Sequence, residues 1–333
     1  MRNHLLAVLL LWSGTTLATT GQERAAEVAH SLVGKPAPQL VLTTIDGDTV
    51  DLGKLYGRTG VYLKFWATWC VPCREQMTHL EETFQRAGDD LAVIGVDAGF
   101  IDTLADVRAF RDQYGLTMPI AIDDGRLADA LNLRVTPQHV VIGRDGRVLY
   151  VGHLVDDRLE SALAEAKKSA TPRIASSAVG DAPPAPHAGN EITSFETKTI
   201  DGNPFSSRDA TVTQPTAFVF LSPWCEDYLE QSRPAVSASC RDVRKQVEDL
   251  LSGNAVRWLG IASGLWATED DLREYRDTYH VTLPLTLDES GTLFRSFDVR
   301  SVPTVVITDA HGRIVRRIEG SEPRLDAVLQ SLR

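Results

Sequence analysis

The chain has 333 residues, which suits two domains of ordinary size and is too long for one small domain. Its apolar content of 43% and charged content of 24% are typical of a folded globular protein. The net charge of −11, without any basic cluster, argues against a nucleic-acid partner, because phosphates must be neutralised by lysine and arginine.

Residues 1–18 have the pattern of a secretion signal. Arg2 precedes an apolar run from Leu5 to Leu11, and small residues follow up to Ala18, where we expect cleavage. An uncleaved anchor is the less favoured alternative, since a membrane span needs about 20 apolar residues. No cysteine lies near the cleavage region, so a lipid anchor is not expected. We therefore expect a soluble, exported, periplasmic protein in a compartment where disulfides form.

The next segment alternates between strand and helix patterns. After a short amphipathic stretch at 23–31, continuous apolar runs predict buried strands, spaced apolar residues predict helices, and a turn between two runs predicts a hairpin. The expected strands are 61–65, 91–96, 118–122, 139–142 and 148–151, and the expected helices are 77–84, 104–114, 127–131 and 159–167. This order indicates an α/β domain with a central mixed sheet flanked by helices.

Between the first strand and helix lies a Cys-x-x-Cys motif. Cys70 and Cys73 in this position are typical of a redox-active dithiol. At the start of a helix, Cys70 would face free backbone N–H groups and the positive end of the helix dipole, which lower a thiol pKa. Pro72 suits the first helical turn. Cys70 is then the nucleophile and Cys73 the resolving thiol. The alternative, half of a zinc site, lacks a second ligand pair in this domain, so we expect no metal.

A change of composition separates two similar halves. Residues 171–189 are rich in proline, alanine, serine and glycine, which predicts an extended linker. Beyond it, sequence landmarks of the first half return in the same order: Thr199–Gly202 repeats Thr44–Gly47, and Trp224-Cys225 repeats Trp69-Cys70, both displaced by 155 positions. We interpret the chain as a tandem duplication.

The run Trp66–Cys73, followed about sixty residues later by Thr136 and Pro137 ahead of a strand, resembles the thioredoxin superfamily. The additional strand and helix between Gly95 and Asp123 are similar to those of periplasmic disulfide reductases of the TlpA/ResA type. The likeness is strong from 34 to 169 and weak from 190 to 333.

This resemblance implies two thioredoxin-like domains, each a central mixed sheet flanked by helices. The first, residues 32–170, would be catalytic, and the second, residues 190–333, degenerate. The resemblance also implies that Pro137 is a cis-proline facing the dithiol, and that Thr136 and Trp69 help to position the substrate.

Two residues depart from the family pattern. Lys64 stands where thioredoxin has a buried aspartate that relays protons, and Gln76 stands where related reductases often have a glutamate. The Lys64 ammonium could point to the dithiol and favour its thiolate, or could snorkel to solvent; the residues alone leave both open. Val219 replaces Lys64 in the second half, where the dithiol is also incomplete, which weakly supports a role for Lys64.

The second half has one cysteine of the motif, because Tyr228 occupies the resolving position. On one unbroken helix Cys225 and Cys240 would lie about 22 Å apart, which forbids a bond. Pro234 and the run Ser237–Ser239 are expected to break that helix, so we hypothesise a structural disulfide worth about 3 kcal/mol. A second redox pair is the alternative.

By resemblance, the chain is expected to be a disulfide reductase with a disulfide-containing protein as substrate, a membrane thiol-relay protein as electron donor, and no cofactor. A thiol oxidase or disulfide isomerase remains open, because direction depends on the reduction potential. A copper metallochaperone or thiol-binding protein is less favoured, since Pro137 in the family shields the dithiol from metal. The second half could also hold a partner protein. A peroxidase is disfavoured, because a Thr-x-x-Cys spacing is absent around Cys70 and Cys225.

Overall fold

The computed structural model describes residues 21–168, 188–209, 211–253, 255–322 and 324–331. The expected signal segment at 1–18 lies outside these residues, as does nearly all of the expected linker at 171–189. Within the ranges given, no helix is both long and apolar enough to span a bilayer.

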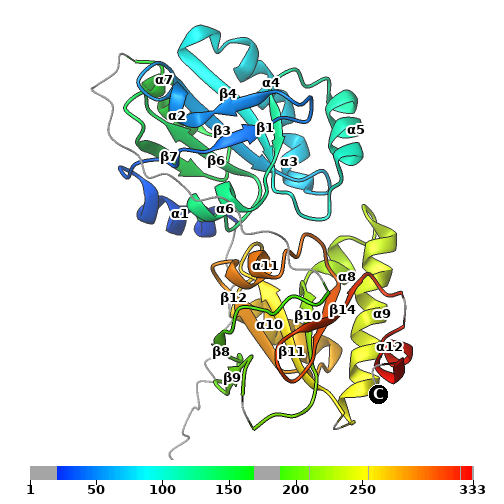
Figure 1. The fold of residues 1–333 in the computed structure, drawn as a ribbon. Helices are drawn as coiled ribbons and strands as arrows, with labels where there is room; N and C mark the ends of the chain where they lie inside the picture. Colours follow the sequence, from blue (N-terminus) through cyan, green and yellow to red (C-terminus); the bar gives the residue numbers. More distant parts are fainter. Residues whose placement is uncertain (1–20, 169–187, 210, 254, 323, 332–333) are drawn as a thin grey trace, which may run out of the picture.

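The first domain is built on a five-stranded mixed sheet in the order β5-β4-β3-β6-β7. Figure 1 labels β4, β3, β6 and β7 of this sheet. β3, β4 and β5 run parallel, whereas β6 and β7 are antiparallel additions. All seven residues of β3 are buried, which accounts for its continuous apolar run. The strands are β3 (Gly60–Trp66), β4 (Leu91–Asp97), β5 (Ile120–Ile122), β6 (Gln138–Ile142) and β7 (Val148–Gly152), preceded by a hairpin of β1 (Val41–Thr43) and β2 (Thr49–Asp51).

Helices cover both faces of this sheet. α4, α5 and α7 pack on the face that carries Tyr62 and Trp66, and α1, α2 and α6 pack on the opposite face. Because side chains alternate along a strand, Lys64 lies on the first of these faces, the one covered by α4. The helices are α1 (Gly21–Leu32), α2 (Leu52–Leu55), α3 (Val71–Glu75), α4 (Met77–Gln85), α5 (Leu104–Tyr114), α6 (Arg126–Ala130) and α7 (Asp157–Ala166), with a 3₁₀ turn at Gly88–Asp90.

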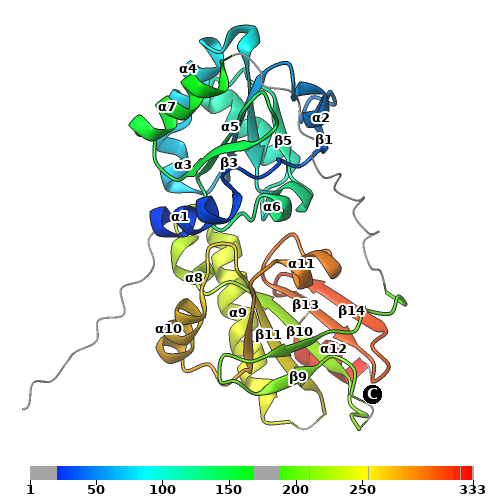
Figure 2. The ribbon, with the colours of Figure 1, turned by 90° about the vertical axis from the view of Figure 1, so that its left-hand side faces the viewer.

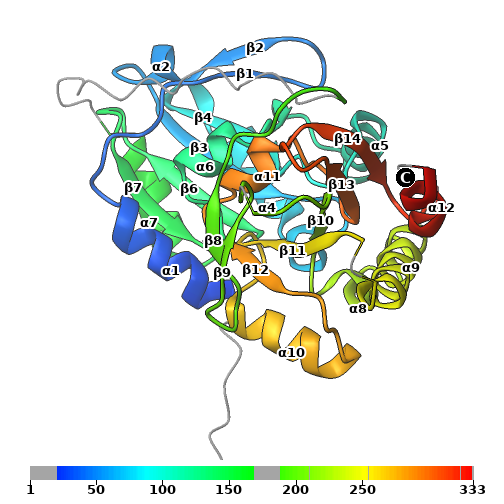
Figure 3. The same cartoon turned by 60° about the horizontal axis from the view of Figure 1, so that its bottom comes forward.

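The second domain repeats this plan. Its sheet has the order β12-β11-β10-β13-β14 with the same parallel and antiparallel pairs, and α12 packs beside α9 (Figure 3). The two sheets show that the chain has two thioredoxin-like domains. The strands are β8 (Glu196–Lys198), β9 (Pro204–Ser206), β10 (Thr216–Leu221), β11 (Arg257–Ser263), β12 (Leu285–Asp288), β13 (Thr304–Thr308) and β14 (Ile314–Glu319); the helices are α8 (Cys225–Tyr228), α9 (Pro234–Leu251), α10 (Glu269–Tyr279), α11 (Thr292–Ser296) and α12 (Leu325–Ser331).

One expectation about the second domain is wrong in detail. Ser237–Ser239 do not break a helix but lie inside α9, which begins at Pro234. Proline is tolerated there because the first helical turn needs no N–H donor, and the Ser237 hydroxyl is satisfied by the carbonyl oxygen of Glu226 at 2.6 Å. The break lies between α8 and α9, ahead of Pro234.

The two domains are stacked end to end, and the ends that face each other carry α3 and α6 of the first domain and α8 and α11 of the second (Figure 1). α1 lies along this boundary, above α10 (Figure 2), where Arg24 forms an ion pair with Asp271 at 2.7 Å. A second ion pair, Arg295–Asp129 at 3.1 Å, joins α11 to α6. One hydrophobic cluster contains residues of both domains, and Phe100 contacts Phe294 of the second domain with ring centres 6.1 Å apart.

Candidate active site

The Cys-x-x-Cys motif lies where the central strand passes into a helix. Cys70 is the N-cap residue of α3, and Cys73 lies in its first turn. The two sulfur atoms are bonded at 2.03 Å, and the backbone N–H of Cys73 donates to Sγ of Cys70 at 3.3 Å. An N–H directed at this sulfur favours its thiolate once the bond is reduced. Pro72 occupies the first turn, as expected.

Strand pairing brings the proline loop to the same place. Phe65 in β3 pairs with Gln138 in β6, so the residues just before β6 lie beside the loop that carries the dithiol. The Thr136–Pro137 peptide bond in that loop is cis, and Thr136 is buried. The structure therefore brings the dithiol, Thr136 and Pro137 to one end of the sheet.

Lys64 is fully buried, so the alternative in which it snorkels to solvent is wrong. Its Nζ donates to the carbonyl oxygen of Gln76 at 3.0 Å, in the kink between α3 and α4. Burial lowers the pKa of Lys64 to about 7, because desolvation disfavours the ammonium. The side chain thus points under the dithiol helix and changes its charge near neutral pH.

A chain of hydrogen bonds extends from Gln76 below the dithiol helix. Oε1 of Gln76 can only accept, so Nε2 of His139 donates to it at 3.0 Å, and Nδ1 of His139 accepts from the Tyr62 hydroxyl at 2.7 Å. Burial, with Lys64 adding repulsion, holds the pKa of His139 well below its usual range, which agrees with this neutral form. The Gln76 amide donates to the carbonyl oxygen of His153 at 3.2 Å.

His153 ties this network to the cis-proline. Its Nδ1 lies 2.6 Å from the carbonyl oxygen of Pro137, which can only accept, so Nδ1 carries the hydrogen. Burial lowers the pKa of His153. Polar groups therefore connect Gln76, in the kink between α3 and α4, to the loop that carries Pro137.

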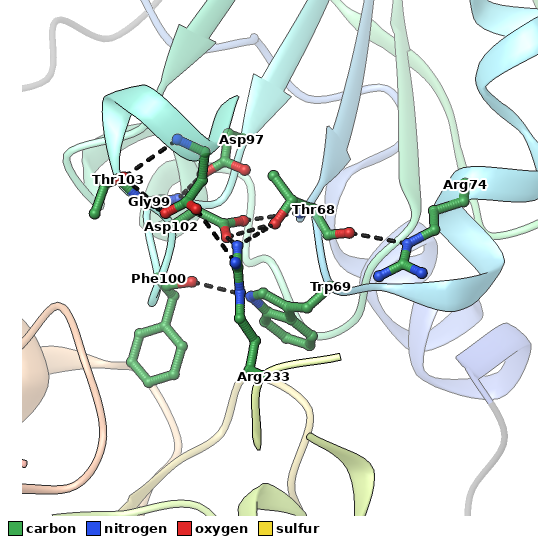
Figure 4. Close-up of polar contacts among 10 residues, drawn as sticks. Thr68, Trp69, Arg74, Asp97, Gly99, Phe100, Asp102, Thr103 and Arg233 are labelled. Carbon is green, nitrogen blue, oxygen red and sulfur yellow. Dashed lines mark hydrogen bonds and ion pairs between the residues drawn. The ribbon is translucent and has the colours of Figure 1, made fainter. Parts of the chain in front are cut away.

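A second polar cluster, which the sequence patterns did not single out, lies at the carboxyl ends of β3 and β4 (Figure 4). Asp102 accepts from the backbone N–H of Thr68 at 2.8 Å and from its hydroxyl at 2.6 Å. Asp97 is fully buried; burial and then repulsion from Asp102 raise its pKa well above the usual range. The carboxyl ends of parallel strands share one edge of a sheet, and this rule could have pointed to Asp97 and Asp102.

The second domain supplies the other half of this cluster. Arg233 donates to Asp102 and to the Thr68 hydroxyl, each at 2.7 Å, and forms an ion pair with Asp106 at 3.2 Å. Arg233 lies just before α9, in the second domain. Its contribution depends on domain packing and leaves no mark in the local sequence.

Aromatic side chains of the second domain surround Trp69, next to Cys70. Trp224 stacks on it with ring centres 5.1 Å apart, and Trp266 and Tyr228 approach edge-on at 4.8 and 6.1 Å. The exposed fraction of Trp69 is only 3%. The dithiol end of the first domain therefore faces the second domain directly.

The corresponding end of the second domain has different chemistry. Cys225 and Cys240 are bonded at 1.93 Å, joining α8 to α9, and Tyr228 occupies the position of Cys73. Val219 pairs with Gly260 as Lys64 pairs with Gly95, so the cation is absent there. The Val302–Pro303 peptide bond is cis. In the described part of the chain, no three His, Cys, Asp or Glu side chains gather as they would around a metal ion.

Known proteins resemble the first domain. Residues 33–151 match the model of the AhpC/TSA family. The thiol-disulfide oxidoreductase ResA of Bacillus anthracis is 33% identical over 169 residues, which cover 49% of this chain and 96% of that protein. The thioredoxin-like protein YneN of Bacillus subtilis is 32% identical over 162 residues, covering 48% and 93%.

A solved structure of a putative protein disulfide isomerase from Bacteroides thetaiotaomicron is 31% identical and covers 39% of this chain and 84% of that one, with a TM-score of 0.36. The ResA and YneN matches span nearly the whole length of those two proteins, and the matched domain carries the bonded Cys70–Cys73 pair at the start of α3. The chain belongs to the thioredoxin-like thiol-disulfide oxidoreductases, the family of ResA.

Proposed function

We propose that the chain is an exported disulfide reductase that uses Cys70 and Cys73 on disulfide-containing proteins. The observation that carries this proposal is the dithiol at the start of α3, beside the cis bond of Pro137. Thr136 and Trp69 are the neighbouring groups proposed to position the substrate.

The proposed reaction transfers two electrons. The Cys70 thiolate attacks one sulfur of the substrate disulfide, which forms a mixed disulfide and releases the first substrate thiolate. The Cys73 thiolate then attacks Sγ of Cys70, which restores the Cys70–Cys73 bond and releases the second substrate thiolate. A dithiol of a membrane thiol-relay protein would reduce the Cys70–Cys73 bond again.

Export and duplication are part of the same proposal. The apolar run after Arg2 supports a signal segment at 1–18, and a second disulfide in addition to the Cys70–Cys73 pair suits an oxidising compartment. The common strand order of the two sheets supports a duplication, with a catalytic domain at 32–170, a linker at 171–189 and a degenerate copy at 190–333. We assign a structural role to the Cys225–Cys240 bond.

One observation favours a second candidate, a thiol oxidase. A buried lysine beneath the dithiol helix stabilises a nearby thiolate when it is protonated, and stabilising the reduced form makes a dithiol a stronger oxidant. In this proposal, the direction of electron flow depends on how strongly the Lys64 ammonium stabilises the reduced form of the Cys70–Cys73 pair.

The reduction potential of the Cys70–Cys73 pair decides between the two. Equilibration in glutathione or dithiothreitol buffers, followed by the fluorescence of the adjacent Trp69, gives this value. A potential between about −270 and −200 mV supports the reductase, whereas a value near about −120 mV supports the oxidase. Cys73→Ala protein should retain its substrate on Cys70 as a mixed disulfide, which mass spectrometry would identify. Absence of any trapped protein from an exported-protein extract would contradict a protein substrate.

A further inference from the structure

The nucleophilic cysteine of the proposed reaction is covered. The exposed fraction of Cys70 is 2%, and that of Cys73 is 0%. The hydroxyl of Tyr228, from the second domain, accepts the backbone N–H of Val71 at 3.2 Å, directly beside Cys70. A thiolate must line up with the substrate disulfide at bonding distance, so this arrangement prevents Cys70 from meeting a folded protein.

The position proposed for the substrate is also occupied. Nε1 of Trp266 donates to the hydroxyl of Thr136 at 2.8 Å, and the backbone N–H of Trp266 donates to the carbonyl oxygen of Arg134 at 3.0 Å. Both acceptors lie in the loop just before Pro137. A bound polypeptide would form hydrogen bonds with such main-chain and hydroxyl groups. In this structure Trp266 already occupies both acceptors.

A charged contact holds the covering domain in place. Asp102 has a side chain with an exposed fraction of 0%, and Arg233 lies against it (Figure 4). The same guanidinium donates to the hydroxyl of Thr68, two residues before Cys70. Hydrogen bonds between charged groups are stronger than neutral ones, so this contact favours the covered arrangement.

The interface is also reciprocal. The backbone N–H of Trp266 donates to Arg134, and at the equivalent place the N–H of Ile101 donates to the carbonyl oxygen of Arg300 at 2.9 Å. Ile101 and Trp266 both have positive φ, 72° and 65°. Each domain thus offers the other the same surface, as subunits do in a two-fold symmetric dimer. The second domain has retained this docking surface while carrying Tyr228 at the resolving position.

We propose that the second domain is an internal cover of the dithiol, and that the domains must separate before Cys70 can attack a protein disulfide. This inference rests on the proposed function of the dithiol. It assigns Trp266 and Arg233 to the closing contact, as positioning residues that do not take part in exchange.

The test measures how fast Cys70 reacts with a bulky thiol reagent in the full chain. In Cys73→Ser protein with the Cys225–Cys240 bond intact, Cys70 is the single free thiol. A maleimide on a long polyethylene glycol should label it slowly. Arg233→Ala should speed labelling by about tenfold or more, because charge-assisted hydrogen bonds to Asp102 are lost. Arg316→Ala, at an exposed arginine of β14 in the same domain, is the matched control and should leave the rate unchanged.

Trp266→Phe provides a second, independent variant. It keeps an aromatic ring but removes the N–H that Thr136 accepts, so it should also speed labelling. Circular dichroism on each variant identifies any loss of fold. If the folded Arg233→Ala and Trp266→Phe proteins label no faster than the parent, or if the parent labels as fast as an unfolded chain, the cover is refuted.

A second readout separates this inference from the proposed function. With Cys73 restored, Arg233→Ala should raise the turnover of insulin disulfides relative to that of oxidised glutathione, because only the protein substrate needs the domains apart. If the ratio of insulin turnover to glutathione turnover is unchanged, the proposed cover is refuted but the proposed dithiol chemistry is not. Failure of the parent and every variant to reduce either disulfide would instead overturn the dithiol chemistry.

Discussion

Replacing Lys64 by methionine should change how the stability of the oxidised protein depends on pH. Methionine has a similar length and no charge, so it can fill the buried space beneath α4. In the parent, burial lowers the pKa of Lys64 to about 7 from 10.5. The unfolded chain therefore binds more protons than the folded chain between these two values. It follows that the free energy of unfolding rises with pH through this window.

The size of the effect follows from the two pKa values. The difference between the pKa values of Lys64 in the unfolded and folded chain corresponds to about 5 kcal/mol in the free energy of unfolding, because one pKa unit corresponds to about 1.4 kcal/mol. Between pH 7 and pH 9, the parent should gain about 2 kcal/mol of stability from Lys64 alone. The Lys64→Met protein lacks this contribution. The difference in the free energy of unfolding between variant and parent should therefore decrease by about the same amount between pH 7 and pH 9. At pH 7 the variant should be the more stable protein.

The assay is urea unfolding of the oxidised proteins, followed by circular dichroism at several pH values from 6 to 10. Taking the difference in the free energy of unfolding between parent and variant at each pH cancels the titrating groups on which Lys64 does not act. Lys54→Met is the matched control, because the Lys54 side chain is 80% exposed and its removal should leave the pH profile unchanged. If the free energies of unfolding of Lys64→Met and the parent differ by a constant amount from pH 7 to pH 9, the assignment of the pH dependence to Lys64 is refuted.

The remaining predictions concern bonds outside the dithiol. Replacing both Cys225 and Cys240 by alanine should lower the free energy of unfolding, measured in urea, by about 3 kcal/mol. The variant should still reduce oxidised glutathione. Loss of this activity would indicate that Cys225 and Cys240 are a second redox pair. Arg244→Met should lower the free energy of unfolding by about 3–5 kcal/mol in the same assay. The reason is that Glu226, whose side chain has an exposed fraction of 2%, would lose both of its hydrogen bonds to the arginine. A decrease below about 1 kcal/mol would contradict this prediction. Tyr62→Phe should cost about 1–3 kcal/mol, because it leaves a buried histidine nitrogen without its donor, and an unchanged urea midpoint would count against it.

Much of the fold could be predicted from the sequence because its signals are local. The strand at 61–65 and the helix that starts at Cys70 are adjacent in the chain, so their apolar patterns and the Cys-x-x-Cys spacing appear together. Thr136 and Pro137 could be added by resemblance. The repeat at a displacement of 155 positions indicated the second domain, although it did not show where the helix after Cys225 would end.

Lys64 could be recognised from the sequence as a departure from the family pattern, but its burial and its hydrogen-bond partner could not be predicted. That partner is a carbonyl oxygen in the kink at Gln76, and the kink exists only once α3 and α4 pack on the sheet. The sequence therefore determined the Cys-x-x-Cys pair, the helix that follows it, and the repeat that indicated a second domain. Only the tertiary structure decided that Arg233 contacts Asp102 and that Trp266 contacts Thr136, because the partners lie 131 and 130 positions apart and each contact needs both domains to be folded.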